Sequence, residues 1–116
     1  MFKFEKLAVW QKSLDLADLV YAETRPFPFE ERFGLTNQLR RAANSAPSNI
    51  AEGSARSDAD FARFVGYATG SLYEVVTQSF IARRQKFLSE ESFARIYADA
   101  DEISRMLSGL RGSLGG

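Results

Sequence analysis

The segment SAPSNIAEG, residues 45–53, carries two hydroxyl groups and a carboxylate inside a stretch with helical periodicity. To act as a nucleophile, Ser45 or Ser48 would need an activating base, usually a histidine and otherwise a lysine. The chain has no histidine, and no lysine lies near these serines in the sequence. The residues therefore favour a structural role, in which Pro47 bends a helix and small side chains let another helix come close.

Two glutamates adjoin apolar helical stripes, and they allow two interpretations. Glu52 and Glu74 can each pair with an arginine, namely Arg40, Arg41 or Arg56, and such pairs fix register more reliably than they add stability. Alternatively, the two carboxylates form an acid–base or Mg²⁺ site, which is the chemistry left open when histidine and cysteine are both missing. Nothing else is spaced like a metal site, so we expect neither a metal nor a cofactor.

The basic residues that could contact phosphates form two short runs, Arg40-Arg41 and the later Arg83, Arg84 and Lys86. The second run ends a predicted helix, where positive charge also complements the helix dipole. Fifteen basic and fifteen acidic residues give zero net charge, which argues against avid binding of polyanions. Contacts from these side chains alone would be few, and their binding would be weak and sensitive to salt.

Apolar periodicity predicts the elements that position these residues. Four helices are expected, and no strand pattern or internal repeat is present: Leu7 to Glu23, about Leu35 to beyond Gly53, Ser57 to about Gln85, and Ser89 to the final glycines. Ser57 and Ser89 are the expected N-terminal caps of the last two helices. We therefore predict an all-α fold, an antiparallel up-down four-helix bundle in a single domain, residues 1–116, with a flexible tail from about residue 112.

The second helix must accommodate Pro47. Its apolar residues continue across the proline without a change of phase: Leu35, Leu39, Ala42, Ala46, Ile50 and Gly53. This continuity predicts one proline-kinked helix and not two separate helices. The polar residues near the bend (Asn44, Ser45 and Ser48) can bond backbone groups that the proline leaves free. Asn49 is expected, with Pro47 and Gly53, to serve the fold or the assembly.

The phenylalanines and the broad first helix predict self-association, and two glycines of the third helix indicate close contact with another helix. Gly66 and Gly70 lie four residues apart inside the third helix, where glycine costs about 1 kcal/mol unless another backbone approaches closely. Five phenylalanines fall outside the main helical stripes, and the apolar arc of the first helix (Trp10, Leu14, Ala17 and Tyr21, widened by Val9, Leu16, Leu19 and Val20) is broad. The five are Phe2, Phe4, Phe27, Phe29 and Phe33. One slim bundle cannot bury all of this surface, and exposed patches of that size mark interfaces.

The sequence indicates a protein of the cytoplasm. Its apolar runs are far too short to span a membrane, so no membrane contact is expected. The first eighteen residues include acidic side chains and lack the apolar core of a signal peptide.

Three segments resemble a known bacterial family: FEKLAVWQKSLDLADLVY, FGLTNQLRRAANSAPSNIAEGSAR and FVGYATGSLYEVVTQ. From Phe4 to about Leu110, the chain is similar to the four-helix-bundle proteins encoded in 23S ribosomal RNA intervening sequences. It is also similar to their relatives, the accessory variability (Avd) proteins of diversity-generating retroelements. One departure is Ala46, where the family usually has isoleucine or valine.

The resemblance implies a ring, typically a pentamer, without known catalytic activity. Retroelement members of the family are basic and bind nucleic acid and a reverse transcriptase, whereas this chain is neutral. The positions that match the motif arginines are Arg40, Arg41 and Arg56.

Residues and resemblance together predict a non-enzymatic homo-oligomeric scaffold or adaptor. Its partner would be structured RNA, DNA or a nucleic-acid enzyme such as a reverse transcriptase. The alternatives are a Mg²⁺-using enzyme built on Glu52 and Glu74, and a purely structural ring that binds another protein.

Overall fold

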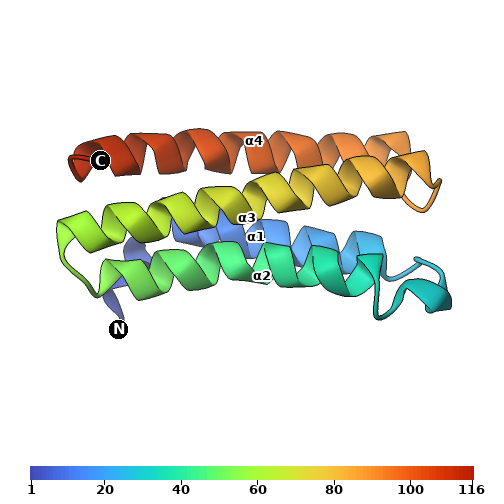
Figure 1. Ribbon diagram of the computed structural model, residues 1–116, viewed down its shortest axis with the longest axis horizontal. Coiled ribbons are helices and arrows are strands. Elements are labelled where there is room, and N and C mark those ends of the chain that lie inside the picture. Colours follow the sequence, from blue (N-terminus) through green and yellow to red (C-terminus); the bar gives the residue numbers. More distant parts are fainter.

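The computed structural model describes all residues, 1–116, and it contains four α-helices and no strand. Two short 3₁₀ helices, η1 and η2, precede α1 and α2 (Figure 1). The elements, in chain order, are η1 (Lys3–Lys6), α1 (Ala8–Thr24), η2 (Phe29–Glu31), α2 (Leu35–Ser54), α3 (Asp58–Arg84) and α4 (Glu90–Ser113). The expected all-α architecture is thus confirmed, and α4 extends one residue past the point where a tail was predicted to begin.

The four helices form an elongated bundle, 42 × 22 × 20 Å in extent. Each helix packs against the one before it and the one after it, and α1 also packs against α4, whereas no diagonal pair is in contact. The side formed by α1 and α2 therefore lies opposite the side formed by α3 and α4. No helix combines the length and the hydrophobicity of a transmembrane span.

The caps that the sequence predicts for the last two helices are formed. The Ser57 hydroxyl accepts a hydrogen bond from the Asp60 amide at 3.3 Å, and the Ser89 hydroxyl accepts one from the Ser92 amide at 3.1 Å. Each bond satisfies an amide that the first helical turn would otherwise leave without a partner. The apolar stripes of α2, α3 and α4 are largely buried as expected and supply most of the core.

The first helix has two overlapping apolar stripes, and only one of them is fully turned toward the core. Val9, Leu16 and Val20 are buried, whereas Leu14 and Tyr21 are each more than a third exposed. The broad apolar arc of α1 thus divides into a core face and a surface face. Because both stripes have helical spacing, periodicity alone could not rank them.

Pro47 lies inside α2, and the helix runs without interruption from Leu35 to Ser54. The prediction of one helix across the proline is therefore confirmed. Polar side chains bond nearby carbonyls: Ser48 donates to the Asn44 carbonyl, and Asn49 donates to the Ser45 carbonyl, each at 2.9 Å. These local bonds belong to the helical turn that contains the proline.

Gly53 brings the C-terminal end of α2 very close to α3. A Cβ at this position would lie 2.6 Å from the Phe64 Cβ and 2.9 Å from the Phe61 ring. Further along the pair, the Ser71 hydroxyl donates to the Ser45 hydroxyl at 2.9 Å. The two helices therefore hold a fixed register over most of their length.

A polar cluster links α1 to the start of α4. The Glu23 carboxylate accepts hydrogen bonds from Ser92 at 2.5 Å and from Arg95 at 2.8 Å. These two bonds, first Ser92 and then Arg95, hold the pKa of Glu23 below its usual value because they stabilise the charged form.

Replacing Gly53 by alanine is expected to destabilise the fold by about 1–2 kcal/mol. The cost arises because the new methyl group overlaps Phe64 in a packed site, and it exceeds the gain in helix propensity. The matched control is Gly109→Ala in α4, where a Cβ meets nothing within 4 Å, and this change should raise stability by up to about 1 kcal/mol. Urea denaturation compares the two variants, and a stabilised Gly53→Ala variant would contradict the close packing.

The stability that Glu23 contributes should depend on pH in the acid range. Its pKa is lower in the folded than in the unfolded chain, so its contribution is present above about pH 4.5. That contribution is lost as the pH falls through the folded pKa, because protonation removes the charge that Ser92 and Arg95 recognise. Glu23→Gln should therefore flatten the pH dependence of the unfolding free energy between about pH 3 and 5. Identical pH profiles for the variant and the parent protein would contradict this expectation.

Candidate nucleic-acid and assembly surfaces

Arg40 is engaged inside the bundle. Its Nε donates to the Thr24 hydroxyl at 2.9 Å, and its guanidinium lies 4.7 Å from the centre of the Tyr21 ring. Asn44 donates to the Tyr21 hydroxyl at 2.9 Å and completes this link between α1 and α2. Arg40 therefore contributes to helix packing, and its guanidinium has little surface left for a phosphate.

Arg41, the next residue, is exposed and lines a polar groove between α2 and α3. Glu74 lines the same groove, together with Gln38 and Gln78, but Arg41 forms no ion pair with it. The Oε1 atom of Gln78 is buried there and accepts no hydrogen bond. The predicted pairing of Glu74 with an arginine is thus not formed within the chain.

Glu52 pairs with Arg56, as one of the interpretations proposed, at 3.4 Å. Both side chains are exposed, so the pair adds little stability. Glu52 lies at the end of α2 that adjoins Phe64, about ten residues of α3 from Glu74, which corresponds to about 15 Å along the axis. The two carboxylates therefore do not share a site, and no cluster of three acidic side chains suited to a metal is present.

The second basic run ends α3 and enters the turn to α4. Arg83 lies 4.0 Å from the Phe93 ring centre and pairs with Glu90 at 3.4 Å, so it serves the fold. Arg84 and Lys86 are exposed and form no ion pair. Lys86 has a φ of 66°, the only positive φ of a non-glycine residue, and its amide donates to the Arg83 carbonyl.

The six basic residues predicted to contact phosphates do not form one patch. Arg56 precedes the first turn of α3 and Arg84 ends this 27-residue helix, so about 40 Å of helix separates them. Of the six basic residues that the sequence offers for phosphate contacts, three are held by neighbours in the chain. The three that remain free are Arg41, Arg84 and Lys86.

A contact between one arginine and two phenylalanines, which sequence reasoning missed, lies in the connection between α1 and α2. The Arg32 guanidinium is 3.7 Å from the ring centre of Phe29 and 4.6 Å from that of Phe33. These phenylalanines are 70% and 80% exposed. The signal in the sequence is the spacing FEERF, which places an arginine between two aromatic residues in a short helical turn.

This connection and the α3–α4 turn share one end of the bundle (Figure 1), where Phe27 packs against Phe87 with ring centres 5.9 Å apart. We call this end the basic tip and define it by its unpaired cations: Arg25, Arg32, Arg84 and Lys86. Among the acidic residues of this end, Glu31 accepts the Leu35 amide and the carboxylates of Glu23 and Glu90 pair with arginines, whereas Glu30 and Glu91 are exposed and form no ion pair.

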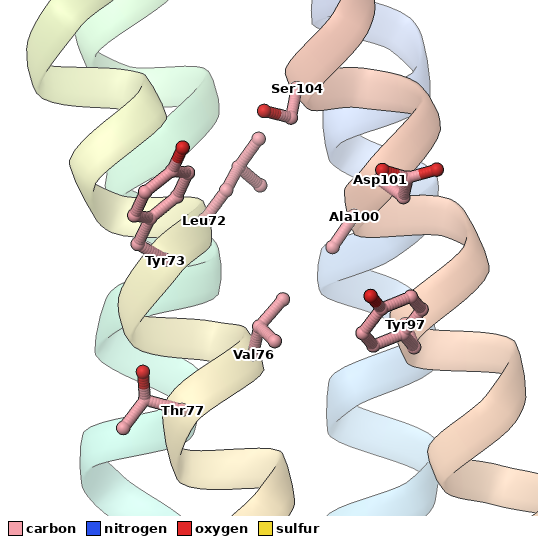
Figure 2. A pocket seen from close by; sticks show the side chains of 8 residues that line it. All are labelled: Leu72, Tyr73, Val76, Thr77, Tyr97, Ala100, Asp101 and Ser104. Carbon is pink, nitrogen blue, oxygen red and sulfur yellow. The ribbon is translucent and has the colours of Figure 1, made fainter.

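A second surface lies between α3 and α4, and Figure 2 shows its residues. Tyr73 on α3 and Tyr97 on α4 flank a hollow, and Leu72 and Val76 form part of its floor. The two tyrosines are 66% and 46% exposed. Sequence reasoning did not single out either residue, although α3 between Phe64 and Ala82 contains a single charged residue, Glu74.

The surroundings of Gly66 and Gly70 in α3 do not show the close helix contact that their four-residue spacing suggests. A Cβ at Gly66 would lie 3.2 Å from the Arg111 guanidinium, which is the flexible end of a side chain and not a backbone. A Cβ at Gly70 would meet nothing within 4 Å. The close helix contact expected at Gly70 is therefore absent within one copy of the chain.

Truncation of the adjacent residues Arg40 and Arg41 should affect the stability of the fold to different extents. Arg40→Ala removes the Thr24 hydrogen bond and the contact with the Tyr21 ring, and it should lower stability by about 1–2 kcal/mol. Arg41→Ala changes an exposed, unpaired side chain and should stay within about 0.5 kcal/mol of the parent protein. Urea denaturation distinguishes them, and equal losses would mean that Arg40 has no special role in packing.

Comparison with known proteins shows which family and which solved structure this bundle resembles. Residues 5–109 match the model of the family described as 23S rRNA-intervening sequence protein. No curated protein matches the sequence significantly. A similar solved structure is a protein with unknown function from the S23 ribosomal protein family of Bacteroides thetaiotaomicron VPI-5482. It is 24% identical, with a TM-score of 0.80 over 90% of this chain and 98% of the other, and it supports the fold. This chain belongs to the family of 23S rRNA-intervening sequence proteins.

Proposed function

We propose that this protein is a non-enzymatic homo-oligomeric adaptor, assembled as a ring, typically of five copies, that holds structured RNA. The observation that carries the assembly is the amount of large apolar surface left exposed by a single copy. These residues include aromatic side chains on several elements: Phe2, Tyr67, Tyr73, Phe80 and Tyr97. Buried against other copies, they would form the aromatic centre typical of interfaces.

The arrangement of charge favours an adaptor over an enzyme. Most carboxylates that adjoin the core already bind a partner in the chain, and Glu52 and Glu74 lie too far apart to act on one atom. General acid–base catalysis requires groups within hydrogen-bond reach of the reacting atoms. The exposed surfaces of the bundle instead offer area for binding a partner.

The basic tip supports RNA as the partner. Arg25, Arg32, Arg84 and Lys86 form no ion pair and can contact phosphates, and the exposed rings of Phe29 and Phe33 can stack on unpaired bases. Arg32 also donates to the Phe29 carbonyl, which fixes its guanidinium beside these rings. Recognition of RNA loops commonly combines such aromatic and arginine surfaces. Four phosphate contacts imply a salt slope of about −3, and hence about 50-fold weaker binding at 200 mM than at 50 mM salt.

Light scattering combined with RNA titration tests this proposal. A ring of five 13.0 kDa chains should have a mass of about 65 kDa. Fluorescence anisotropy with a labelled RNA stem–loop should give the salt dependence above. The double variant Arg84→Gln and Lys86→Gln should halve the salt slope, because it removes two of the four contacts. The matched control is Arg56→Gln with Arg63→Gln at the opposite end, which should leave RNA binding unchanged.

Each part of the proposal can fail separately. A protein that remains monomeric at about 100 μM would overturn the assembly. An oligomer that ignores RNA at 50 mM salt would overturn the choice of RNA and point to a protein partner, such as a reverse-transcriptase-like enzyme or another component of a structural ring.

A further inference from the structure

The polar groove between α2 and α3 contains two charged side chains that have no partner in the chain. Its volume is about 450 Å³, which lies within the range of about 300–1,000 Å³ typical of small-molecule sites. Arg41 lines it from α2 and Glu74 from α3, and both are exposed. Neither forms an ion pair, with the other or with any other residue. The two helices therefore offer a set of hydrogen-bond donors and a set of acceptors that the fold does not use.

The amide of Gln78 is a third group in this groove whose hydrogen bonds are incomplete. Its Oε1 atom is buried and accepts no hydrogen bond, which is rare in folded proteins. Its Nε2 atom donates to Gln38 Oε1 at 3.4 Å, which is longer than the usual range of about 2.7–3.2 Å. Rotation of the amide toward the groove would break only this long bond and would present the oxygen to a ligand. The groove therefore favours a ligand that carries more than one donor.

The groove lies close to the basic tip. At this end of the bundle α2 begins with Leu35 and α3 ends with Arg84 (Figure 1). Gln38 is three residues from the first of these positions and Gln78 is six residues from the second, which corresponds to about 5 and 9 Å along the helix axes. An RNA strand whose phosphates contact the tip can therefore continue along α2 and α3 and place an unpaired base in the groove. Contacts to phosphates position a strand, whereas contacts to a base edge recognise its sequence.

We infer that the α2–α3 groove binds an unpaired guanine base of the RNA through Arg41 and Glu74. This inference rests on the proposed RNA-binding function and names the base that is recognised. Guanine carries two neighbouring donors, N1–H and the N2 amino group, which match the two oxygens of the Glu74 carboxylate. Its O6 and N7 atoms are neighbouring acceptors, which match the forked donors of the Arg41 guanidinium. The Gln78 oxygen supplies a further acceptor beside the carboxylate.

The other three bases match these two side chains less well. Adenine and cytosine each carry one amino group beside a ring nitrogen that accepts, so one oxygen of Glu74 would face another acceptor. Uracil carries a single donor, N3–H, between two carbonyl acceptors. An ionised carboxylate accepts hydrogen bonds and donates none, so each of these bases leaves an oxygen of Glu74 without a donor. Guanine alone pairs with both oxygens and still offers two acceptors to Arg41.

Fluorescence anisotropy at 50 mM salt, with labelled RNA hairpins that differ only at one unpaired loop position, tests the inference. The guanosine hairpin should bind at least about 10-fold more tightly than the adenosine, cytidine and uridine hairpins, because a good bidentate contact discriminates to that extent. Glu74→Gln replaces an accepting oxygen by a donor and should reduce this preference to less than about 3-fold. The matched control is Asp18→Asn, which removes an exposed, unpaired carboxylate from α1 and should keep the preference for guanosine.

Base analogues assign each contact to one side chain. Inosine lacks the N2 amino group, and 7-deazaguanosine lacks the N7 acceptor, so each should weaken binding to the parent protein by at least about 5-fold. Inosine should cause no further loss in Glu74→Gln, and 7-deazaguanosine none in Arg41→Gln, because each variant already lacks the partner of the missing atom. Arg41→Gln should also leave the salt slope unchanged, since a contact to a base releases no counterion from a phosphate.

The outcomes separate this inference from the proposed function. If all hairpins bind equally well and with the salt dependence expected for the basic tip, the inference is wrong and RNA binding stands. A preference for another base, a preference for guanosine that survives in Glu74→Gln and Arg41→Gln, or a lower salt slope in Arg41→Gln also overturns it. If no hairpin binds at 50 mM salt, the proposed function fails and the inference fails with it. Both substituted side chains are exposed, and circular dichroism establishes that each variant is folded.

Discussion

The close approach of α2 to α3 is the constraint on which the rest of the structure depends. Gly53 leaves no room for a Cβ against Phe64, and a hydrogen bond joins Ser45 to Ser71 further along the pair. Small residues occupy the α2 side of this seam, including Ala42 and Ala46. The absence of a side chain at Gly53 leaves room for Phe61 and Phe64 of α3, which are buried against it.

The charged residues fall into two groups, those that bind a partner within the bundle and those that are left without one. Three charged side chains contact neighbouring helices or rings and help to hold these elements in place: Arg40, Arg83 and Glu23. Four of the cations left without an ion pair, Arg25, Arg32, Arg84 and Lys86, lie at the end where the α1–α2 connection meets the α3–α4 turn, and three others, Lys3, Lys6 and Arg111, lie at the opposite end. Net charge alone conceals this distribution, because a neutral total does not reveal which charges already have partners.

Much of the fold could be predicted from the sequence, because periodicity and caps are local signals. The first residues of α3 and α4 follow from the caps Ser57 and Ser89, and the continuity of α2 follows from the phase of its apolar residues across Pro47. The surfaces could be predicted only in part. Which stripe of α1 faces the core depends on the position of α2, and whether Arg40 is free depends on Thr24, sixteen residues earlier in the chain. Contacts of this kind arise from tertiary packing, which no single helix encodes.

The lysine in the left-handed turn after α3 illustrates a trade-off between stability and role. At the φ of 66° that Lys86 adopts, glycine avoids a steric cost of about 1–2 kcal/mol. A lysine at this position therefore holds a positive charge at a fixed point of the turn, at the expense of the stability that glycine would add. Selection for stability alone would replace it. Its side chain projects from a turn whose backbone is held by bonds from Phe87 and Leu88 to the Ala82 carbonyl, so the charge is presented on a rigid support.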